Sequence, residues 1–293
     1  MSVPLSLPKF PSWFAEAFAH LEQQVANERL PHALLIDGPG GWGEPLLASA
    51  LACLLLGLER ESIARDIAHP DLRWIEPEDG TIKIDQIRAL SAFIAQTPRH
   101  GDRKVAIVDE AHHMNANSAN ALLKTLEEPP DGSYLVLVTD SLHQLIPTIR
   151  SRCQRVQLAT PSPQAVSAWL TEQGVDHPHL DMLMVEYGNA PYRVMDAVER
   201  DEQPLWLALT GVRAGTLTAI DAADDLRKEN LVDVTGRWLR HVHRMAQSGA
   251  APVELLKLGD ELTALRAAAL SNTGLNKRIQ LERLFLRWRD LPS

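Results

Sequence analysis

A glycine-rich loop in the first third of the chain has the spacing of a phosphate-binding loop. Residues 38–45 read GPGGWGEP and lie between an apolar run, residues 33–36, and a stretch with helical spacing. A loop of this type has the pattern G-x-x-x-x-G-K-[S/T], and its backbone N–H groups cradle phosphate oxygens. Gly38 and Gly43 occupy the two framing positions. The spacing therefore predicts the backbone geometry of a phosphate site.

The two positions that follow this loop hold the wrong side chains for nucleotide chemistry. A working loop needs a lysine for the phosphates and a hydroxyl for Mg²⁺, but the sequence has Glu44 and Pro45 there. Like charges about 4 Å apart repel by roughly 4 kcal/mol at an effective dielectric constant of about 20. Pro45 has neither a hydroxyl nor a backbone N–H. We therefore expect no ATP bound in cis and no intrinsic ATPase activity.

Polar residues also follow two later apolar runs. Asp109 and Glu110 follow the run 105–108, which has the form of a Walker B segment whose acids serve Mg²⁺ and the attacking water. Thr139 ends a further apolar run, at a position suited to sensing a bound phosphate. Many strands end in acids, and without the lysine and hydroxyl these acids have no nucleotide to serve. We interpret them as remnants of an ATP site.

The elements that must position these residues alternate between strands and helices. Short, fully apolar strands that alternate with helices indicate a parallel sheet covered on both faces. The expected strands are residues 33–36, 72–75, 105–108 and 134–139, and the expected helices are 12–28, 46–58, 84–96 and 115–128. The first half therefore predicts an α/β domain.

The second half of the chain changes character after two prolines near residue 161. The leucines at 255, 258, 262 and 265 have helical spacing, and no later stretch has the pattern of a strand. We expect an α/β domain at residues 1–158, a small helical lid at 159–201 and an all-helical collar at 202–293. Leu275, Ile279 and Leu286 are expected as collar-packing residues on one helical face.

The composition excludes several classes of protein. The chain has 293 residues, of which 45% are hydrophobic, and a net charge of −9. It has no long uncharged apolar run that would predict a membrane span, and two cysteines a hundred residues apart do not form a zinc quartet. The acidic balance disfavours a free-standing nucleic-acid binder. We expect a cytoplasmic protein without a metal site.

Several segments together resemble one known family. Residues 122–130 read LLKTLEEPP and residues 151–153 read SRC, with RLPHA at 29–33, IDQIR at 84–88 and NTGLNK at 272–277. These strings resemble clamp-loader subunits of the AAA+ class, and the match is strongest to the delta-prime family of bacterial DNA polymerase III. The resemblance is dense over residues 20–160. It implies an AAA+ P-loop-type sheet, a helical lid and a helical collar used for oligomerisation.

The resemblance also implies partners and a role for one arginine. Members of this family stand in a hetero-pentameric ring with gamma/tau and delta subunits, which hold ATP and Mg at the seams. The ring loads a sliding clamp onto primer-template DNA in replication. Arg152 matches the arginine of the Ser-Arg-Cys motif, with Ser151 and Cys153, that reaches in trans into a neighbour's ATP site. Such an arginine stabilises the charge on the transferred phosphoryl group.

Other candidate residues have weaker signals. Arg193 lies where an AAA+ lid has a second sensor arginine, although an ion pair on a helix surface explains it equally well. Many relatives have a four-cysteine zinc module that residues 58–70 lack. For His112, Lys104 and Lys124 we expect ordinary solvated positions.

Two other functions are alternatives to the hypothesis of a clamp-loader subunit without ATPase activity. An active AAA+ ATPase of the gamma/tau type would need a lysine and a hydroxyl at positions 44 and 45, where the sequence has Glu44 and Pro45. A nucleic-acid-binding module that works alone would show steeply salt-dependent binding to DNA.

Overall fold

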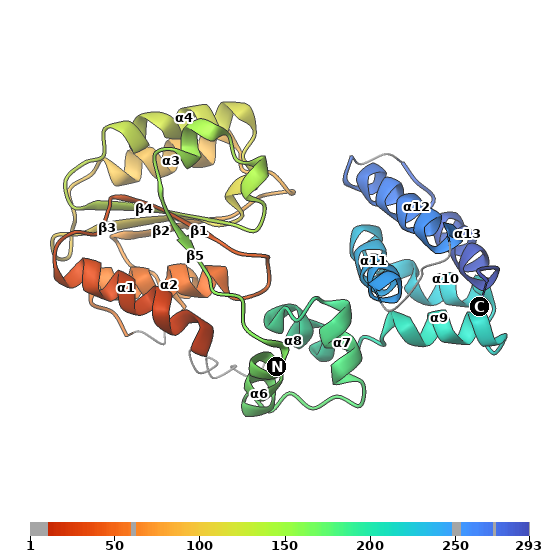
Figure 1. Cartoon of the computed structure of the whole chain (residues 1–293). Helices are drawn as coiled ribbons and strands as arrows, with labels where there is room; N and C mark the ends of the chain where they lie inside the picture. Colours follow the sequence, from red (N-terminus) through yellow and green to blue (C-terminus); the bar gives the residue numbers. More distant parts are fainter. Residues whose placement is uncertain (1–10, 60–62, 248–252, 272–273, 293) are drawn as a thin grey trace. The chain divides into compact units, whose positions relative to one another are not determined.

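The computed structural model describes residues 11–59, 63–247, 253–271 and 274–292. The chain forms two compact units, residues 1–173 and 174–293 (Figure 1). The boundary between these units falls within the lid expected at 159–201, and the three-domain division stays a prediction. None of the helices in the described ranges is both long and apolar enough to cross a membrane.

The first unit contains a five-stranded parallel sheet with the order β2-β3-β4-β1-β5. The two strands β1 and β3 are buried along their whole length, as apolar runs in the middle of a covered sheet should be. This arrangement confirms the predicted parallel sheet. The strands are β1 (Ala33–Asp37), β2 (Leu72–Ile75), β3 (Lys104–Val108), β4 (Ser133–Thr139) and β5 (Gln154–Gln157).

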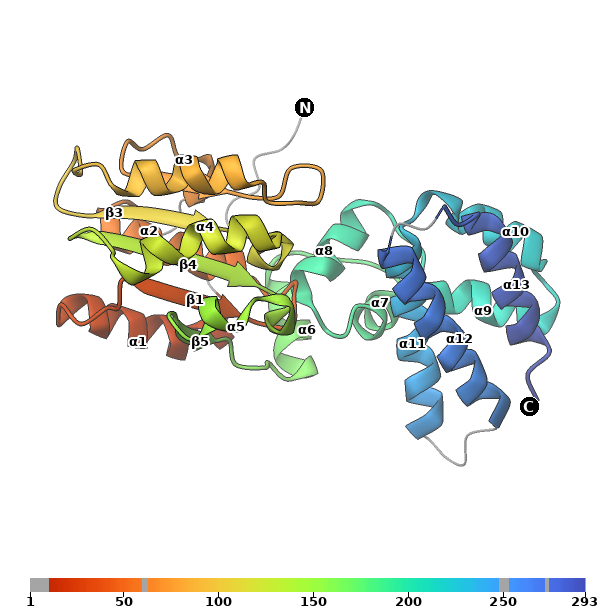
Figure 2. The same ribbon diagram turned by 90° about the horizontal axis from the view of Figure 1, so that it is seen from above.

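Helices cover both faces of the sheet. Figures 1 and 2 show α3 and α4 over one face and α1 and α2 over the other. Leu122 and Leu126 of α4 are buried against the sheet together with Leu90 of α3. The helices of this unit are α1 (Ala15–Ala26), α2 (Glu44–Leu56), α3 (Ile84–Ile94), α4 (Ala116–Glu127), α5 (Pro147–Arg150) and α6 (Pro163–Glu172), with short 3-10 turns at Ser12–Phe14, Ala64–Asp66, Ala111–His113 and Leu142–Gln144.

A buried ion pair ties the starts of β2 and β3 together. The ammonium of Lys104 lies 3.1 Å from the carboxylate of Asp71, and both side chains are shielded from solvent. Burial alone would raise the pKa of Asp71, but the backbone N–H groups of Arg99 and His100 and the Lys104 ammonium lower it to about 2. The expectation that Lys104 is solvated was wrong, because the partner is 33 residues away in sequence.

Among its described residues, the second unit contains helices and the turns that connect them, and no strand. Trp238 of α11 packs against Phe285 and Trp288 of α13, and Leu258 and Leu262 of α12 complete the core. The helices are α7 (Leu180–Glu186), α8 (Pro191–Glu199), α9 (Leu205–Ala214), α10 (Ala219–Asp225), α11 (Leu231–Gln247), α12 (Val253–Leu270) and α13 (Lys277–Arg289), with a 3-10 turn at Leu226–Lys228.

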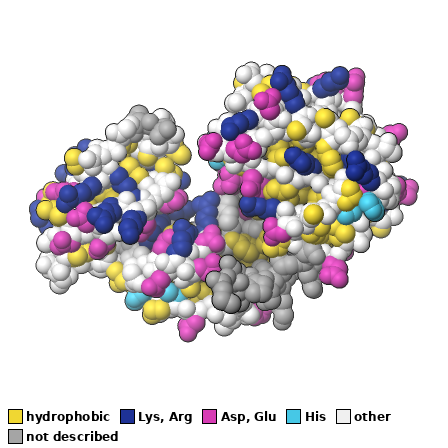
Figure 3. Space-filling model, turned by 180° about the vertical axis from the view of Figure 1, so that it is seen from behind, with side chains coloured by type: hydrophobic (Ala, Val, Ile, Leu, Met, Phe, Trp, Pro, Cys, Tyr) yellow, Lys and Arg dark blue, Asp and Glu magenta, His cyan; other side chains and the backbone are white. Residues whose placement is uncertain are grey.

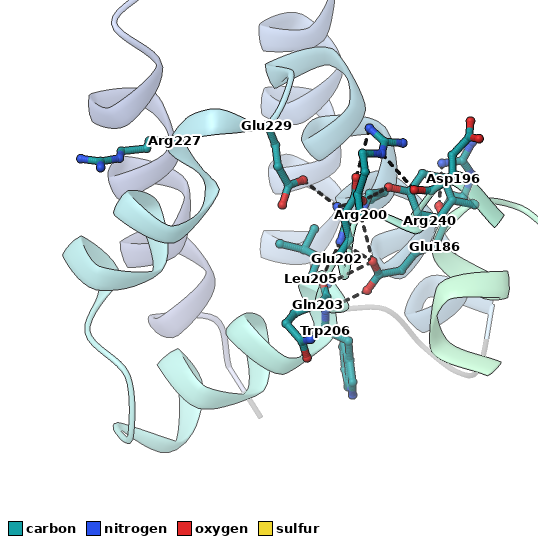
Figure 4. A network of polar contacts seen from close by, with 12 residues as sticks. Glu186, Asp196, Arg200, Glu202, Gln203, Leu205, Trp206, Arg227, Glu229 and Arg240 are labelled. Carbon is teal, nitrogen blue, oxygen red and sulfur yellow. Dashed lines mark hydrogen bonds and ion pairs between the residues drawn. The ribbon is translucent and has the colours of Figure 1, made fainter. Parts of the chain in front are cut away.

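One buried glutamate joins three helices of the second unit (Figure 4). The Glu186 carboxylate, at the end of α7, accepts hydrogen bonds from the backbone N–H groups of Leu205 and Trp206, at 3.0 and 2.8 Å, in the first turn of α9. It also pairs with Arg237 at 2.8 Å and with His241 at 2.9 Å, both on α11. Because a buried charge needs such partners, this network fixes α7, α9 and α11 relative to one another.

Some expectations for the helical collar were wrong. Ile279 is 58% exposed and Leu286 is 37% exposed, so neither is in the core. Leu275 is partly buried against the core. The first two residues of the 272–277 motif lie outside the described residues. The leucines expected at helical spacing on α12 are all buried: Leu255, Leu258, Leu262 and Leu265.

Candidate nucleotide-loop and arginine sites

The candidate residues of the first unit lie at the carboxyl ends of its strands. Asp37 ends β1 and pairs in register with Thr139, the last residue of β4. The N–H of Gly38 donates to the carbonyl of Thr139 at 3.3 Å, and the N–H of Asp109 donates to the carbonyl of Ile75. Since parallel strands end at the same edge, the glycine loop, the acids after β3 and Thr139 share one end of the sheet.

The glycine loop turns sharply between β1 and α2. Gly40, Gly41 and Gly43 have φ angles of 84°, 77° and 99°, a region in which side chains other than glycine are strained. Gly43 precedes α2, whose first two residues are Glu44 and Pro45. Proline suits this position because the first N–H groups of a helix have no partner within it. The predicted loop geometry is therefore present.

The Glu44 side chain folds back into this loop. Its carboxylate accepts hydrogen bonds from the N–H groups of Gly40, at 2.9 Å, and Trp42, at 3.1 Å. Glu44 is only 3% exposed. A Cβ at Gly38 would lie 2.2 Å from Oε1 of Glu44, so a larger residue there would force the carboxylate to move. The loop amides that would cradle a phosphate bind a carboxylate of the chain itself.

Neighbouring aromatic residues hold the loop in this conformation. The indole N–H of Trp13 donates to the backbone carbonyl of Trp42 at 3.0 Å. Trp13 also makes an edge-on contact with Trp169 of α6, with 5.5 Å between ring centroids. Trp13 and Trp42 are both buried. The loop is therefore anchored at its middle as well as at its two ends.

The two acids after β3 differ in their surroundings. Burial and the nearby Glu110 and Glu76 carboxylates raise the pKa of Asp109 to about 6, even though it accepts the N–H of Glu110. Glu110 is exposed, has a positive φ of 47° and lies 3.2 Å from His113. Among the described residues, no group of three or more His, Cys, Asp and Glu side chains is arranged to hold a metal ion.

Thr139 is buried and already has polar partners. Its hydroxyl accepts the N–H of Ser141 at 3.0 Å and lies 3.1 Å from Nδ1 of His112. Nε2 of His112 lies 3.4 Å from Asp140. Burial lowers the pKa of His112, which keeps the ring neutral at physiological pH. The expectation of a solvated His112 was wrong, because β4 brings Thr139 beside it.

Arg152 lies just after α5 on the surface of the first unit. Its guanidinium pairs with Glu127 at 2.6 Å and donates to the carbonyl of Thr148 at 2.9 Å. Its side chain is 36% exposed. This ion pair joins the two sequence motifs, because Glu127 belongs to LLKTLEEPP and Arg152 to SRC. The two motifs are separated in the sequence, and this ion pair shows that they are neighbours in the fold.

The other residues of the SRC motif have structural contacts. The Ser151 hydroxyl donates to the carbonyl of Thr148 at 3.2 Å. Cys153 packs against the core under α3 and α4, and burial raises the pKa of its thiol to about 12. A thiol that stays protonated is a poor nucleophile. Cys153 therefore serves to pack the motif.

Sequence reasoning missed one arginine beside the glycine loop. Arg155 of β5 forms a two-point ion pair with Asp37, the last residue of β1, with one N–O distance of 2.7 Å. The two residues are 118 positions apart, and residues 154–157 show no periodic pattern that would predict β5. Arg193, the sensor-like residue, lies on α8 in the second unit.

Comparisons with known proteins identify the family. The family described as DNA polymerase III, delta subunit, matches residues 14–162. A DNA polymerase III subunit delta' from Pseudomonas aeruginosa is 32% identical, and the match covers 89% of this chain and 93% of the relative. The chain belongs to the delta-prime family of DNA polymerase III. A second delta-prime relative, from Bacillus subtilis, is 34% identical over 62% of this chain and 58% of its own length.

A solved structure shares the fold of this delta-prime family member. A DNA polymerase III gamma subunit-related protein from Thermotoga maritima has a TM-score of 0.64 and 20% identity, and the match covers 94% of this chain and 99% of that chain. This likeness confirms the predicted fold, a parallel sheet covered by helices and followed by further helices. In the delta-prime chain, the edge of that sheet holds a glycine loop filled by Glu44.

Proposed function

We propose that this chain is a clamp-loader subunit that hydrolyses no ATP itself and supplies Arg152 in trans to the ATP site of a neighbouring subunit. It would act within the DNA polymerase III assembly during the loading of the sliding clamp onto primed DNA. The observation behind the proposal is the contrast between two sites on one unit. The Glu44 carboxylate occupies the N–H groups of the glycine loop, whereas Arg152 of the SRC motif lies at the surface.

The filled loop supports the absence of ATPase activity. An incoming phosphate would have to displace the Glu44 carboxylate from the N–H groups of Gly40 and Trp42. It would gain no lysine in exchange, because position 44 is the glutamate itself, and no hydroxyl for Mg²⁺, because position 45 is proline. ATP and Mg would therefore be bound by the neighbouring subunit.

The surroundings of Arg152 support a role in trans. An exposed ion pair such as Glu127–Arg152 contributes only about 0–1 kcal/mol, so a phosphate of higher charge can replace Glu127. The planar guanidinium is always charged and binds phosphate oxygens at two points. An arginine supplied in trans raises phosphoryl transfer rates by about 10³–10⁵.

The shared fold supports a ring of related subunits. Subunits of one fold can repeat the same head-to-tail contact around a closed ring, and the gamma subunit-related structure has the fold of this chain. We propose gamma/tau and delta subunits as the two neighbours in a hetero-pentamer. Exposed apolar side chains on α12 and α13, such as Leu256 and Ile279, would contribute contacts in the collar.

The test is Arg152→Ala in an assembly reconstituted from the full chain with gamma/tau and delta subunits. The variant should assemble normally, because Arg152 has only exposed partners. ATP hydrolysis at the seam next to this chain, stimulated by clamp and primed DNA, should fall by about 10³. Arg150→Ala is the matched control, because Arg150 is an exposed arginine of the same segment, and its turnover should be that of the wild type.

A further variant separates the arginine from its resting partner. Glu127→Ala removes the ion pair but leaves Arg152 in place, so turnover should change by no more than about fivefold. Unchanged turnover in a fully assembled Arg152→Ala complex would show that this arginine does not act on the neighbour's ATP.

A further inference from the structure

The second unit contains a polar pocket that the proposed function does not use. Its volume is about 480 Å³, and Arg193 of α8, Arg240 of α11 and Arg266 of α12 all line it. The three arginines come from three helices, and each is half-buried. Seen from behind, Lys and Arg side chains gather over the surface of this unit (Figure 3).

Basic side chains outnumber acidic ones in the pocket. Six basic and three acidic residues line it, although the whole chain has a net charge of −9. Two of the acids pair with basic residues of the same lining, because Glu229 pairs with Arg237 at 2.7 Å and Glu202 pairs with Arg200 at 3.2 Å. The charge of the third acid, Asp233, acts to raise the pKa of Arg240. Among the described residues, Arg240 and Arg266 form no ion pair with a carboxylate.

The positive charges of the three arginines repel one another in the folded unit. Burial and the neighbouring charges of Arg193 and Arg266 lower the pKa of Arg240. Like charges in a half-buried position repel one another and are screened only in part by solvent. Arg240 is fixed by a hydrogen bond of 2.8 Å to the carbonyl of Glu186. A bound anion would remove this repulsion.

Two glycines make room for the guanidinium groups. A Cβ at Gly236, inside α11, would lie 2.9 Å from NH1 of Arg266, and a Cβ at Gly188 would lie 3.1 Å from Nε of Arg240. Glycine inside a helix costs roughly 0.5–1 kcal/mol relative to alanine. The absence of a side chain at Gly236 therefore leaves space for the Arg266 guanidinium, and the methyl group of an alanine would occupy part of that space.

We propose that this pocket binds phosphate groups through Arg240 and Arg266, with Arg193 adding positive charge. Guanidinium groups recognise phosphate oxygens at two points. The phosphates could belong to a small polyphosphate or to a nucleic-acid backbone, and the experiment below separates these sources. The site is independent of the proposed role of Arg152, because it is measured as binding by the isolated full chain.

The first experiment is a calorimetric titration of the full chain with inorganic pyrophosphate at low salt. The wild type should bind at one site, and Arg266→Gln should bind at least tenfold more weakly. Arg244→Gln is the control, because Arg244 is on the same helix as Arg240 but does not line this pocket. It should bind like the wild type. Absence of pyrophosphate binding by the wild type overturns the proposal.

The second experiment changes the geometry and keeps the charge. Gly236→Ala should fold at least as well as the wild type, because alanine is the better helix former by roughly 0.8–1 kcal/mol. Its new Cβ would lie 2.9 Å from NH1 of Arg266, so the guanidinium must shift, and pyrophosphate binding should weaken, though less than in Arg266→Gln. Binding that is unaffected by both Arg266→Gln and Gly236→Ala would place the anion elsewhere, for example at the glycine loop, and would overturn the proposal.

A competition identifies the source of the phosphate. If a primed DNA duplex displaces pyrophosphate from the wild type but binds Arg266→Gln weakly, the site takes a nucleic-acid backbone. The affinity for DNA should then fall as salt rises, as expected for released counterions. If DNA does not compete, the ligand is a small polyphosphate.

Discussion

Glu44→Ala should leave the glycine loop without the anion that fills it. The N–H groups of Gly40 and Trp42 would lose their acceptor, and both residues are buried. Each buried donor without a partner costs about 1–3 kcal/mol. The free energy of unfolding of the first unit should therefore fall by about 2–6 kcal/mol. Glu172→Ala, at an exposed position, should change it by no more than about 0.5 kcal/mol.

The assay combines urea denaturation with amide hydrogen exchange. Denaturation followed by tryptophan fluorescence gives the change in stability, and exchange measured over residues 38–47 reports on the loop itself. In Glu44→Ala the amides of Gly40 and Trp42 should exchange faster than in the wild type. Glu44→Gln should be intermediate, because its single amide oxygen retains one acceptor.

Protected loop amides in a fully stable Glu44→Ala variant would refute this reasoning. They would show that the carboxylate is not what satisfies the loop. A phosphate would then not have to displace Glu44, and only the missing lysine and hydroxyl would disfavour a bound nucleotide.

Three other substitutions follow from buried charges, and urea denaturation across pH measures each. Asp71→Asn should lower the free energy of unfolding by about 3–5 kcal/mol at neutral pH, because the Lys104 ammonium stays buried without a partner. The folded pKa of Asp71 is lowered to about 2, so this stabilisation is present above about pH 4 and is lost as pH falls toward 2. Asp109→Asn should raise stability at pH 8 by up to about 3 kcal/mol, because burial raises the pKa of Asp109 to about 6; the gain should vanish below about pH 4. Arg237→Ala should destabilise the second unit by about 3–5 kcal/mol, since Glu186 would lose its buried cation.

The sequence predicted the strands well where the strand is an almost continuous apolar run. The strand at Leu72–Ile75 was predicted to the residue, and β3 and β4 to within one residue, because covered parallel strands are continuous apolar runs. The glycine spacing also predicted the loop and its position at the strand ends. Both signals depend on residues that are adjacent in sequence.

The sequence was uninformative where partners are distant or a strand is exposed. β5 has one buried residue among four, so it shows no apolar run. The pairs Asp71–Lys104 and Asp37–Arg155 join residues 33 and 118 positions apart, and no local pattern predicts them. The repulsion between Glu44 and phosphate was predicted, but its hydrogen bonds to the loop depend on the folded backbone.

The most direct test of the non-ATPase claim is a titration of the isolated wild-type chain with Mg-ATP, with ATP hydrolysis measured in parallel. Arg266→Gln is titrated beside it, so that binding in the second unit is recognised by its loss. We predict no micromolar binding at the glycine loop and no hydrolysis above background. Micromolar Mg-ATP binding that survives Arg266→Gln and is accompanied by turnover would contradict the account.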